Sequence, residues 1–188
     1  MFTATEVEQL GSQGFFTRAS FLGPELALRV LTEARTIPLR RAGIRRSHQL
    51  DETVRSDALA WLTKDETSGA LAIAVTHFER LMHELNEAAW LGLRTFDLQL
   101  ARYAPGAHYA RHRDAFPGQD NRRITAIVYL NPLWVPEHGG QLLLHVEPPF
   151  ELEPTLDRLV VFRSELVEHE VLPARADRWA LTAWYSAR

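Results

Sequence analysis

The chain has 188 residues, of which 46% are apolar and 24% charged, and this length suits one domain with a full-sized core. It contains no cysteine, which excludes disulfides, thiolate zinc sites, iron–sulfur clusters and cysteine nucleophiles. Any metal must therefore be held by carboxylates and by some of the eight histidines. The formal net charge of -3 does not favour nucleic acid as a partner.

The first ten residues, MFTATEVEQL, carry two glutamates and no apolar core of the kind found in a signal peptide. The longest apolar stretch, from Gly69 to Thr76, is far too short to cross a bilayer. We therefore expect a cytoplasmic protein without a membrane partner.

Helices are expected in the first part of the chain, residues 1–92. Gly23-Pro24 is typical of a helix start, and apolar positions recur from Glu25 to Arg35 before a proline ends the helix. A second helix is predicted from Ser68 to about Ala89, where apolar residues follow three- and four-residue spacing.

Between these helices lies an arginine-rich segment, RRAGIRRSHQLDETVRSD. A solvated loop is one interpretation, and a basic rim beside a binding cleft is the other. The sequence by itself leaves both open. The arginines are Arg40, Arg41, Arg45, Arg46 and Arg55.

From Leu93 onward, short runs rich in β-branched and aromatic residues are bounded by Gly, Pro, Asn or Asp. This pattern is typical of successive strands in a sandwich or barrel, not of strands alternating with helices. We therefore predict a mainly β fold with flanking helices, as one domain over residues 1–188. Residues 1–92 would form a helical support packed on one sheet, and residues 93–188 a core of about eight strands.

His112 and Asp114 stand two residues apart, a spacing that places both side chains on one face of a strand. An imidazole and a carboxylate on one face make two-thirds of a metal site, although such a pair is more often a surface ion pair. The third ligand should come from a distant strand, and His169 is the best candidate. His138 and His145 are the competitors.

Arg178 follows His169 by nine residues, within the terminal run RWALTAWY. If this run is a strand, Arg178, Ala180, Thr182 and Trp184 share one face. An arginine on the inner face of an apolar strand is costly unless it meets an anion, so a carboxylate partner is expected. That partner is either a ligand or a protein carboxylate.

Taken together, these segments resemble the Fe(II)- and 2-oxoglutarate-dependent oxygenases, and more narrowly the prolyl 4-hydroxylase group. The similarity rests on HxD, the distal histidine, the arginine nine residues later, and the segments ARYAPGAHYARHRD, RRITAIVYLNPLW, HGGQLLLH and DRLVVFRS. RSDALAW, from Arg55 to Trp61, resembles a segment that precedes the barrel in the same group. The resemblance covers roughly residues 55–188.

The resemblance implies a double-stranded β-helix, or jelly-roll, with Fe(II) held by His112, Asp114 and His169. It further implies cofactor-binding roles for a second set of residues. Arg178 and Tyr129 would bind the distal carboxylate of 2-oxoglutarate, Thr182 and Trp184 would line the co-substrate wall, and Tyr103 would lie near the metal and 2-oxoglutarate.

By the same resemblance, the chain would be a dioxygenase that hydroxylates a C–H bond while converting 2-oxoglutarate and O2 to succinate and CO2. Ascorbate dependence is suggested only by the family. A prolyl or other side chain of a protein or peptide is the first substrate expected, and a free amino acid or small metabolite is the alternative. A cupin-like metal-binding module without turnover is a third reading, which Arg178 and Tyr129 disfavour. The core motif fixes neither the substrate nor the oligomeric state.

Two further expectations concern aromatic and histidine side chains. Strand alternation allows His108, four residues before His112, to share the inner face. Trp184 is expected to face the cavity, and most of the five tryptophans are expected to pack in the core. They are Trp61, Trp90, Trp134, Trp179 and Trp184.

Overall fold

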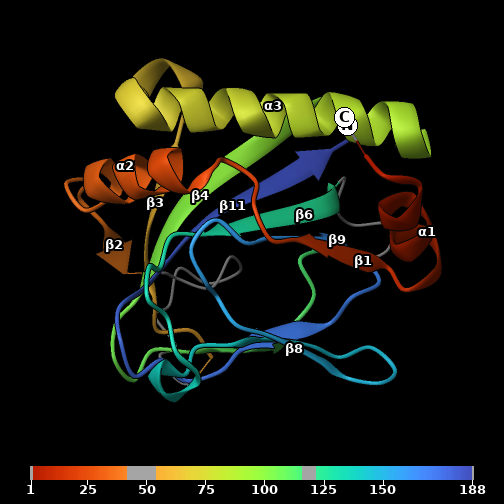
Figure 1. The fold of residues 1–188 in the computed structure, drawn as a ribbon. Helices are drawn as coiled ribbons and strands as arrows, with labels where there is room; N and C mark the ends of the chain where they lie inside the picture. The colour runs from red at the N-terminus through yellow and green to blue at the C-terminus, as the bar shows by residue number, and fades with distance from the viewer. Residues whose placement is uncertain (1, 42–53, 116–121, 188) are drawn as a thin grey trace.

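The computed structural model describes residues 2–41, 54–115 and 122–187, and its strands form two antiparallel sheets. The larger sheet has seven strands and carries helices on one face (Figure 1). In order across this sheet, the strands are β1 (Phe15–Arg18), β9 (Leu159–Arg163), β6 (Arg122–Tyr129), β11 (Arg178–Ser186), β4 (Thr95–Tyr103), β3 (Ala58–Leu62) and β2 (Arg40–Arg41).

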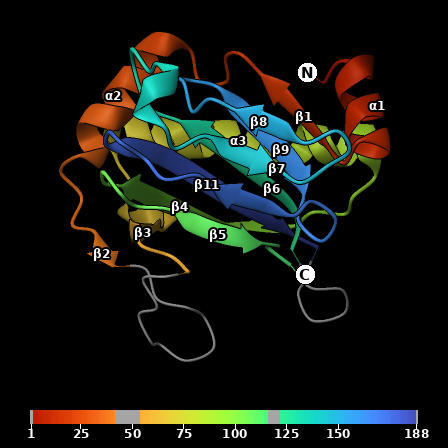
Figure 2. The same ribbon diagram turned by 90° about the horizontal axis from the view of Figure 1, so that it is seen from below.

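The smaller sheet faces the other side of these long strands, and in Figure 2 its strands lie in front of them. Its four strands are shorter, each spanning three or four residues. In order they are β5 (Tyr109–His112), β10 (His169–Val171), β7 (Leu142–Leu144) and β8 (Phe150–Leu152). The described residues after Leu93 thus hold eight strands, β4 to β11, and the predicted jelly-roll architecture is confirmed.

Three α-helices come from the amino-terminal part of the chain: α1 (Ala4–Ser12), α2 (Pro24–Ala34) and α3 (Gly69–Ala89). The second and third match the predicted helices to within a residue at each end. Two short 3-10 turns, η1 (Lys64–Glu66) and η2 (Pro136–His138), complete the described elements. No helix in the described part of the chain is long and apolar enough to cross a bilayer.

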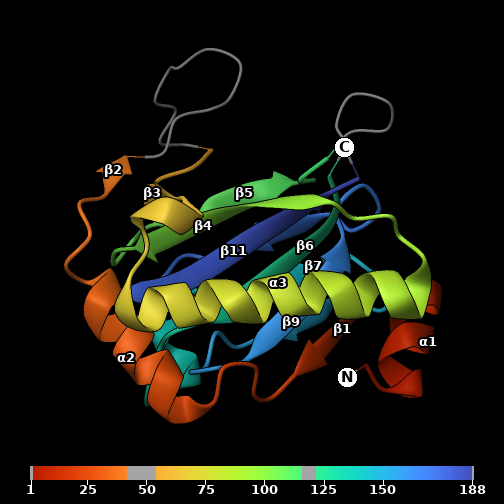
Figure 3. The same cartoon turned by 90° about the horizontal axis from the view of Figure 1, so that it is seen from above.

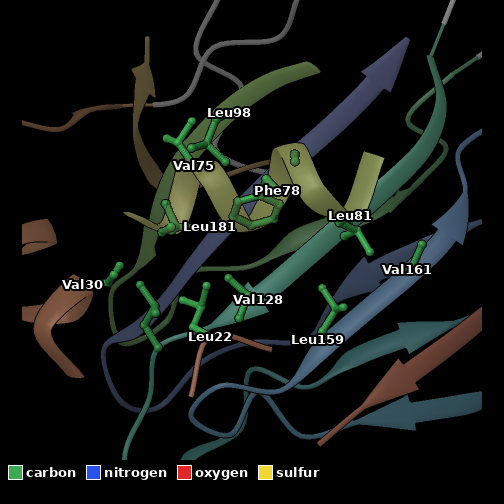
Figure 4. Packing of buried hydrophobic residues seen from close by; sticks show 14 of the residues in the cluster. Leu22, Val30, Val75, Phe78, Leu81, Leu98, Val128, Leu159, Val161 and Leu181 are labelled. Atoms are coloured by element: carbon green, nitrogen blue, oxygen red, sulfur yellow. The ribbon is translucent and has the colours of Figure 1, made fainter. Parts of the chain in front are cut away.

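Helix α3 crosses the large sheet and buries its apolar side against it (Figure 3). Phe78 and Leu81 point from α3 toward Leu181 and Val128 on the strands below (Figure 4). These residues are at most 1% exposed. The helices therefore cover one face of the sheet and leave the opposite face to the smaller sheet.

Strand alternation separates two cores. On β11, Leu181, Ala183 and Tyr185 belong to the helix-facing core, whereas Ala180 belongs to the core between the sheets. Because successive side chains point to opposite faces, one strand serves both cores. This division places the polar residues of β11 between the sheets.

The amino-terminal part is more than a helical support, because β1, β2 and β3 from this region extend the large sheet. β1 pairs with β9 and β3 pairs with β4, both through contacts distant in sequence. Of the arginine-rich segment, Arg40 and Arg41 form β2, while Arg45 and Arg46 lie outside the described residues.

The expectation for the tryptophans is wrong at two positions. Trp90 is 91% exposed in a left-handed conformation that ends α3, and Trp61 is 51% exposed. Trp179 and Trp184 are buried as predicted. Composition alone did not distinguish these positions, because exposure depends on where the element lies. Trp90 ends a helix, and Trp61 stands on a strand near the sheet edge, where the Trp184 ring, 5.5 Å away, covers only part of it.

Candidate active site

A pocket lies between the two sheets, with walls contributed by β4, β6 and β11 on one side and by β5, β7 and β10 on the other. All the site residues predicted from the sequence line this pocket except Tyr129, whose ring lies beside Arg178. The predicted lining residues are Tyr103, His112, Asp114, His169, Arg178, Thr182 and Trp184.

His112, Asp114 and His169 form a compact cluster, with one possible ligand atom from each lying within 4.8 Å of the others. The Asp114 oxygens lie 3.7 Å from His112 Nε2 and 3.7 Å from His169 Nε2. His112 and His169 are direct cross-strand partners on β5 and β10. Asp114 lies two residues past the end of β5, so the chain bend and not strand alternation alone directs its carboxylate to the cluster.

Backbone carbonyls orient both imidazoles. His112 Nδ1 lies 2.8 Å from the Ala110 carbonyl oxygen, and His169 Nδ1 lies 3.2 Å from that of Val167. A carbonyl oxygen only accepts, so each Nδ1 carries the proton and each Nε2 directs its lone pair to the cluster. This donor set fits Fe(II) held by two histidines and one carboxylate.

The protonation states also suit a divalent cation. Burial raises the pKa of Asp114, but the neighbouring His169 and His112 and hydrogen bonds outweigh this effect and hold that pKa below its usual range. One of these bonds comes from Thr125 Oγ1, at 2.7 Å. Burial lowers the pKa of His169 to about 4. At neutral pH the cluster therefore presents a carboxylate and a neutral His169 imidazole, the forms that bind metal.

The competing histidines lie elsewhere. His145 Nε2 is 2.9 Å from Glu170 Oε1, and His138 packs on Trp134. Neither belongs to a metal-ligand cluster within the described residues. His108 precedes β5 and approaches Ser56 Oγ with its Nδ1 at 3.4 Å, and it is not among the residues that line the pocket.

Arg178 is 2% exposed and lies between two tyrosine rings, with its guanidinium carbon 4.8 Å from the Tyr103 ring centre and 5.0 Å from that of Tyr129. Its Nε donates to the Gly140 carbonyl oxygen at 2.7 Å. Gly140 has a φ of +65°, and a Cβ there would lie 2.9 Å from Arg178 Cδ, so glycine permits this close approach.

No carboxylate of the described residues pairs with Arg178, and a buried ion pair within the protein is therefore the wrong alternative. The buried Tyr129 hydroxyl has no hydrogen-bond partner there either. Burial raises the pKa of Tyr129 to about 12 against the opposing charge of Arg178. A guanidinium and a neutral hydroxyl thus lie together without an anion, which is the arrangement expected of a carboxylate site.

Sequence reasoning missed Tyr109. This ring stacks on His112 with centroids 3.6 Å apart and planes 16° apart, and it lines the pocket. Residues three apart on a regular strand face opposite sides. A bulge in the β5–β10 pairing, where His112 and Tyr109 oppose His169 and Val171, brings both rings to the same side.

A second missed group is Arg55 with its partners Asp57 and Gln99. Arg55 donates to Asp57 at 2.5 and 2.8 Å and to Gln99 Oε1 at 3.1 Å. Arg55 and Gln99 line the pocket. The segment RSDALAW pointed to this region but did not indicate which of its side chains enter the site.

Comparisons with known proteins agree with this geometry. Residues 98–186 match the family model of the 2OG-Fe(II) oxygenase superfamily. A crystal structure of a Pseudomonas putida prolyl-4-hydroxylase is 35% identical, with a TM-score of 0.88 and coverage of 98% of both chains. A Trichoplax adhaerens prolyl hydroxylase, solved with a hypoxia inducible factor oxygen degradation domain peptide fragment, is 30% identical, with a TM-score of 0.88 and coverage of 97% of this chain and 87% of that one.

Human prolyl hydroxylase EGLN3 is 32% identical over an alignment of 154 residues that covers 77% of this chain. The chain spans less than two thirds of the length of the curated relatives it matches, 62% in the human case. The fold and the His112–Asp114–His169 cluster in the pocket between the sheets are thus those of a 2OG-Fe(II) oxygenase. The chain belongs to the prolyl 4-hydroxylase family of the 2OG-Fe(II) oxygenase superfamily, as the sequence resemblance predicted.

Proposed function

We propose that this chain hydroxylates a side chain of a protein or peptide, most specifically a prolyl residue, with Fe(II) held by His112, Asp114 and His169. The observation that carries the proposal is the unpaired Arg178–Tyr129 group in the pocket that also holds the histidine–aspartate cluster. A cupin-like module would not need an anion site beside its metal. An oxygenase that uses 2-oxoglutarate does need one.

The chain's own residues would bind and orient the reactants. Arg178 and Tyr129 would donate hydrogen bonds to the distal carboxylate of 2-oxoglutarate at the buried end of the pocket, with Tyr103 packed on the guanidinium. Apolar lining residues such as Ile127 and Leu142 would exclude water. When bound, Fe(II) with 2-oxoglutarate and O2 supplies oxidative decarboxylation to succinate and CO2 coupled to hydroxylation of a C–H bond.

Thr182 and Trp184 would form the co-substrate wall along β11. Thr182 follows Arg178 by four residues on the pocket side of the strand, and Trp184 follows by six. The side chains therefore form a row that starts at the buried Arg178 and ends at Trp184. The cross-strand partner of Trp184 is Thr125, and Thr125 donates a hydrogen bond to Asp114, so the row ends at the level of the metal-ligand cluster.

An anaerobic titration with Fe(II) and 2-oxoglutarate tests the site. A bidentate 2-oxo acid on ferrous iron gives a weak visible charge-transfer band, and wild type should show it. Arg178→Ala should need about 100-fold more 2-oxoglutarate, because charge-assisted hydrogen bonds to the carboxylate are lost. Arg102→Ala is the matched control, since Arg102 pairs with Asp177 and is 41% exposed on its side chain. An unchanged 2-oxoglutarate requirement in Arg178→Ala would refute the assignment.

The substrate class needs a separate experiment. Relatives at 30–35% identity are prolyl hydroxylases, and one of them was solved with a peptide, which supports a peptide over a free amino acid. Incubation with the oxygen degradation domain peptide or with free L-proline, followed by mass spectrometry, should show the gain of one oxygen on the peptide only. Oxygen added to free proline alone would favour the alternative substrate class.

Ascorbate as a reductant and a cytoplasmic location complete the proposal. Both rest on the resemblance and on the sequence pattern. Measurement of turnover with and without ascorbate would check the first. Fractionation of cells that express the chain would check the second.

A further inference from the structure

Three charged side chains lie outside the pocket, on residues next to the metal-ligand cluster in the sequence. Arg111 and Arg113 stand on either side of His112. Glu168 directly precedes His169. Successive side chains along an extended chain point to opposite faces, and the charged side chains here are more exposed than the ligands beside them. They do not line the pocket, so they lie on its outer side.

Glu168 contacts both arginines. Its Oε2 accepts a hydrogen bond from Arg111 Nε at 2.7 Å and another from Nη2 of the same guanidinium. Its Oε1 lies 3.4 Å from Arg113 Nη2. One carboxylate therefore connects the residue before β10 to the two residues that flank the ligand at the end of β5. We refer to Glu168, Arg111 and Arg113 as the outer ion-pair group.

The pairing of β5 with β10 ends where the ligands lie. Its last pair is His112 with His169, next to a bulge. Asp114 lies two residues beyond this pair, where the described residues form no further pairing between the two segments. The outer ion-pair group spans this gap, because Arg113 directly precedes Asp114 and reaches Glu168.

The distance between these two segments sets the distance between the ligands. His112 and Asp114 come from one segment, and His169 comes from the other. Asp114 Oδ2 and His169 Nε2 are 3.7 Å apart across the two segments. Metal ligands must be held close to the binding geometry by the groups around them, so a contact that fixes the two segments on the outside also fixes the ligand set on the inside.

The same contacts contribute little to the stability of the fold. The Arg111 side chain is 56% exposed and that of Glu168 is 31% exposed. Ion pairs with this much solvent access have small effects on the free energy of unfolding. An effect of these residues on metal binding can therefore be measured separately from a general loss of structure.

We propose that Glu168 is a positioning residue for the metal centre. Through the two arginines, it holds the segment that carries His112 and Asp114 beside the segment that carries His169. The inference rests on the proposed function, which assigns Fe(II) to these three ligands. It adds a group outside the pocket on which the arrangement of the ligands depends.

A titration with Co(II) in the absence of 2-oxoglutarate and substrate tests this role. The visible absorption of Co(II) reports both the bound fraction and the coordination geometry. Glu168→Gln should raise the dissociation constant of Co(II) about 3- to 10-fold, the range expected for one hydrogen bond, and should alter the absorption bands of the bound ion.

Arg102→Met is the matched control. Arg102 makes a similarly exposed ion pair with two hydrogen-bond donors to Asp177, away from the cluster. This variant should bind Co(II) with the affinity and the absorption of wild type. Without metal, its midpoint of urea denaturation should equal that of Glu168→Gln, because each variant loses one exposed ion pair.

Arg111→Met separates positioning from a simple effect of charge. If the charges acted only through their field, removal of a positive charge near the cation would tighten Co(II) binding, whereas removal of the Glu168 charge would weaken it. Positioning predicts that both substitutions weaken Co(II) binding. The double variant should then bind no more weakly than Glu168→Gln alone, because the two residues act through one contact.

The outcomes distinguish this inference from the function on which it rests. Co(II) binding in Arg111→Met as tight as in wild type, or tighter, would overturn the inference and leave the metal site standing. Wild-type affinity and absorption in Glu168→Gln would do the same. Failure of wild type to bind Co(II), or unchanged binding in Asp114→Ala, would refute the ligand assignment of the proposed function itself.

Discussion

At the scale of single residues, the pocket holds polar groups that the protein leaves unpaired. The Tyr129 hydroxyl and the Trp184 indole N–H are buried without partners among the described residues. A buried unsatisfied group typically costs about 1–3 kcal/mol. Such groups are retained where a ligand completes their hydrogen bonds, and here both lie along one strand pair, β6 and β11.

Tyr129→Phe should therefore change stability and binding in opposite directions. Removal of the unpaired hydroxyl should leave the free energy of unfolding unchanged or raise it by up to about 1 kcal/mol, while 2-oxoglutarate affinity should fall about 10-fold. Urea denaturation of the free protein and the anaerobic titration measure the two effects. Tyr185→Phe is the control, because the Tyr185 hydroxyl donates to the Phe78 carbonyl at 3.0 Å and its loss should destabilise. A clear loss of stability in Tyr129→Phe would contradict the argument.

At the scale of elements, α3 begins without a cap from its own residues. The Ser68 side chain makes no capping hydrogen bond. Instead, Glu33 at the end of α2 accepts from the backbone N–H groups of Ala70 and Leu71 at 2.8 and 2.9 Å. One carboxylate thus satisfies two free donors, interacts with the positive end of the helix and joins α2 to α3.

Glu33→Ala should lower the free energy of unfolding by about 2 kcal/mol, the upper range for loss of a helix cap. Chemical denaturation measures this directly. Arg29→Ala, at an exposed position of the same helix, should change stability by less than about 0.5 kcal/mol. Equal effects of the two substitutions would show that Glu33 contributes nothing as a cap.

At the scale of the whole molecule, the two sheets are stabilised differently. The large sheet is covered by helices on one face and by the small sheet on the other. The small sheet has only strands of three or four residues, and the metal-ligand cluster joins β5 to β10. A bound cation should therefore stabilise the folded chain as a whole through mass action.

Zn(II) at 100 times its dissociation constant should raise the free energy of unfolding by about 2.7 kcal/mol, and a chelator should reverse the change. The increase should be absent in Asp114→Ala and retained in Asp97→Ala, whose carboxylate lies outside the cluster and is 61% exposed. Melting curves with and without the metal check both. An equal increase in Asp114→Ala would mean that zinc binds elsewhere.

The sequence by itself determined the parts that local periodicity encodes. Apolar spacing located α2 and α3 nearly to the residue, and alternation placed Arg178, Thr182 and Trp184 on one face of β11. The need for a ligand from a distant strand favoured His169 over His138 and His145, and the structure brings His169 to His112 and Asp114. These features depend on short-range spacing and on a motif order that the chain carries directly.

Only the tertiary structure decided the rest. The bulge that brings Tyr109 beside His112 depends on which strand pairs with β5. The Arg55–Gln99 contact joins residues 44 positions apart, and β1 and β3 also join the large sheet through pairings distant in sequence. The alternation of residues within one strand specifies which face of the sheet a side chain prefers. The residue that it meets on the neighbouring strand is set by long-range packing. Periodicity within one segment does not encode that pairing.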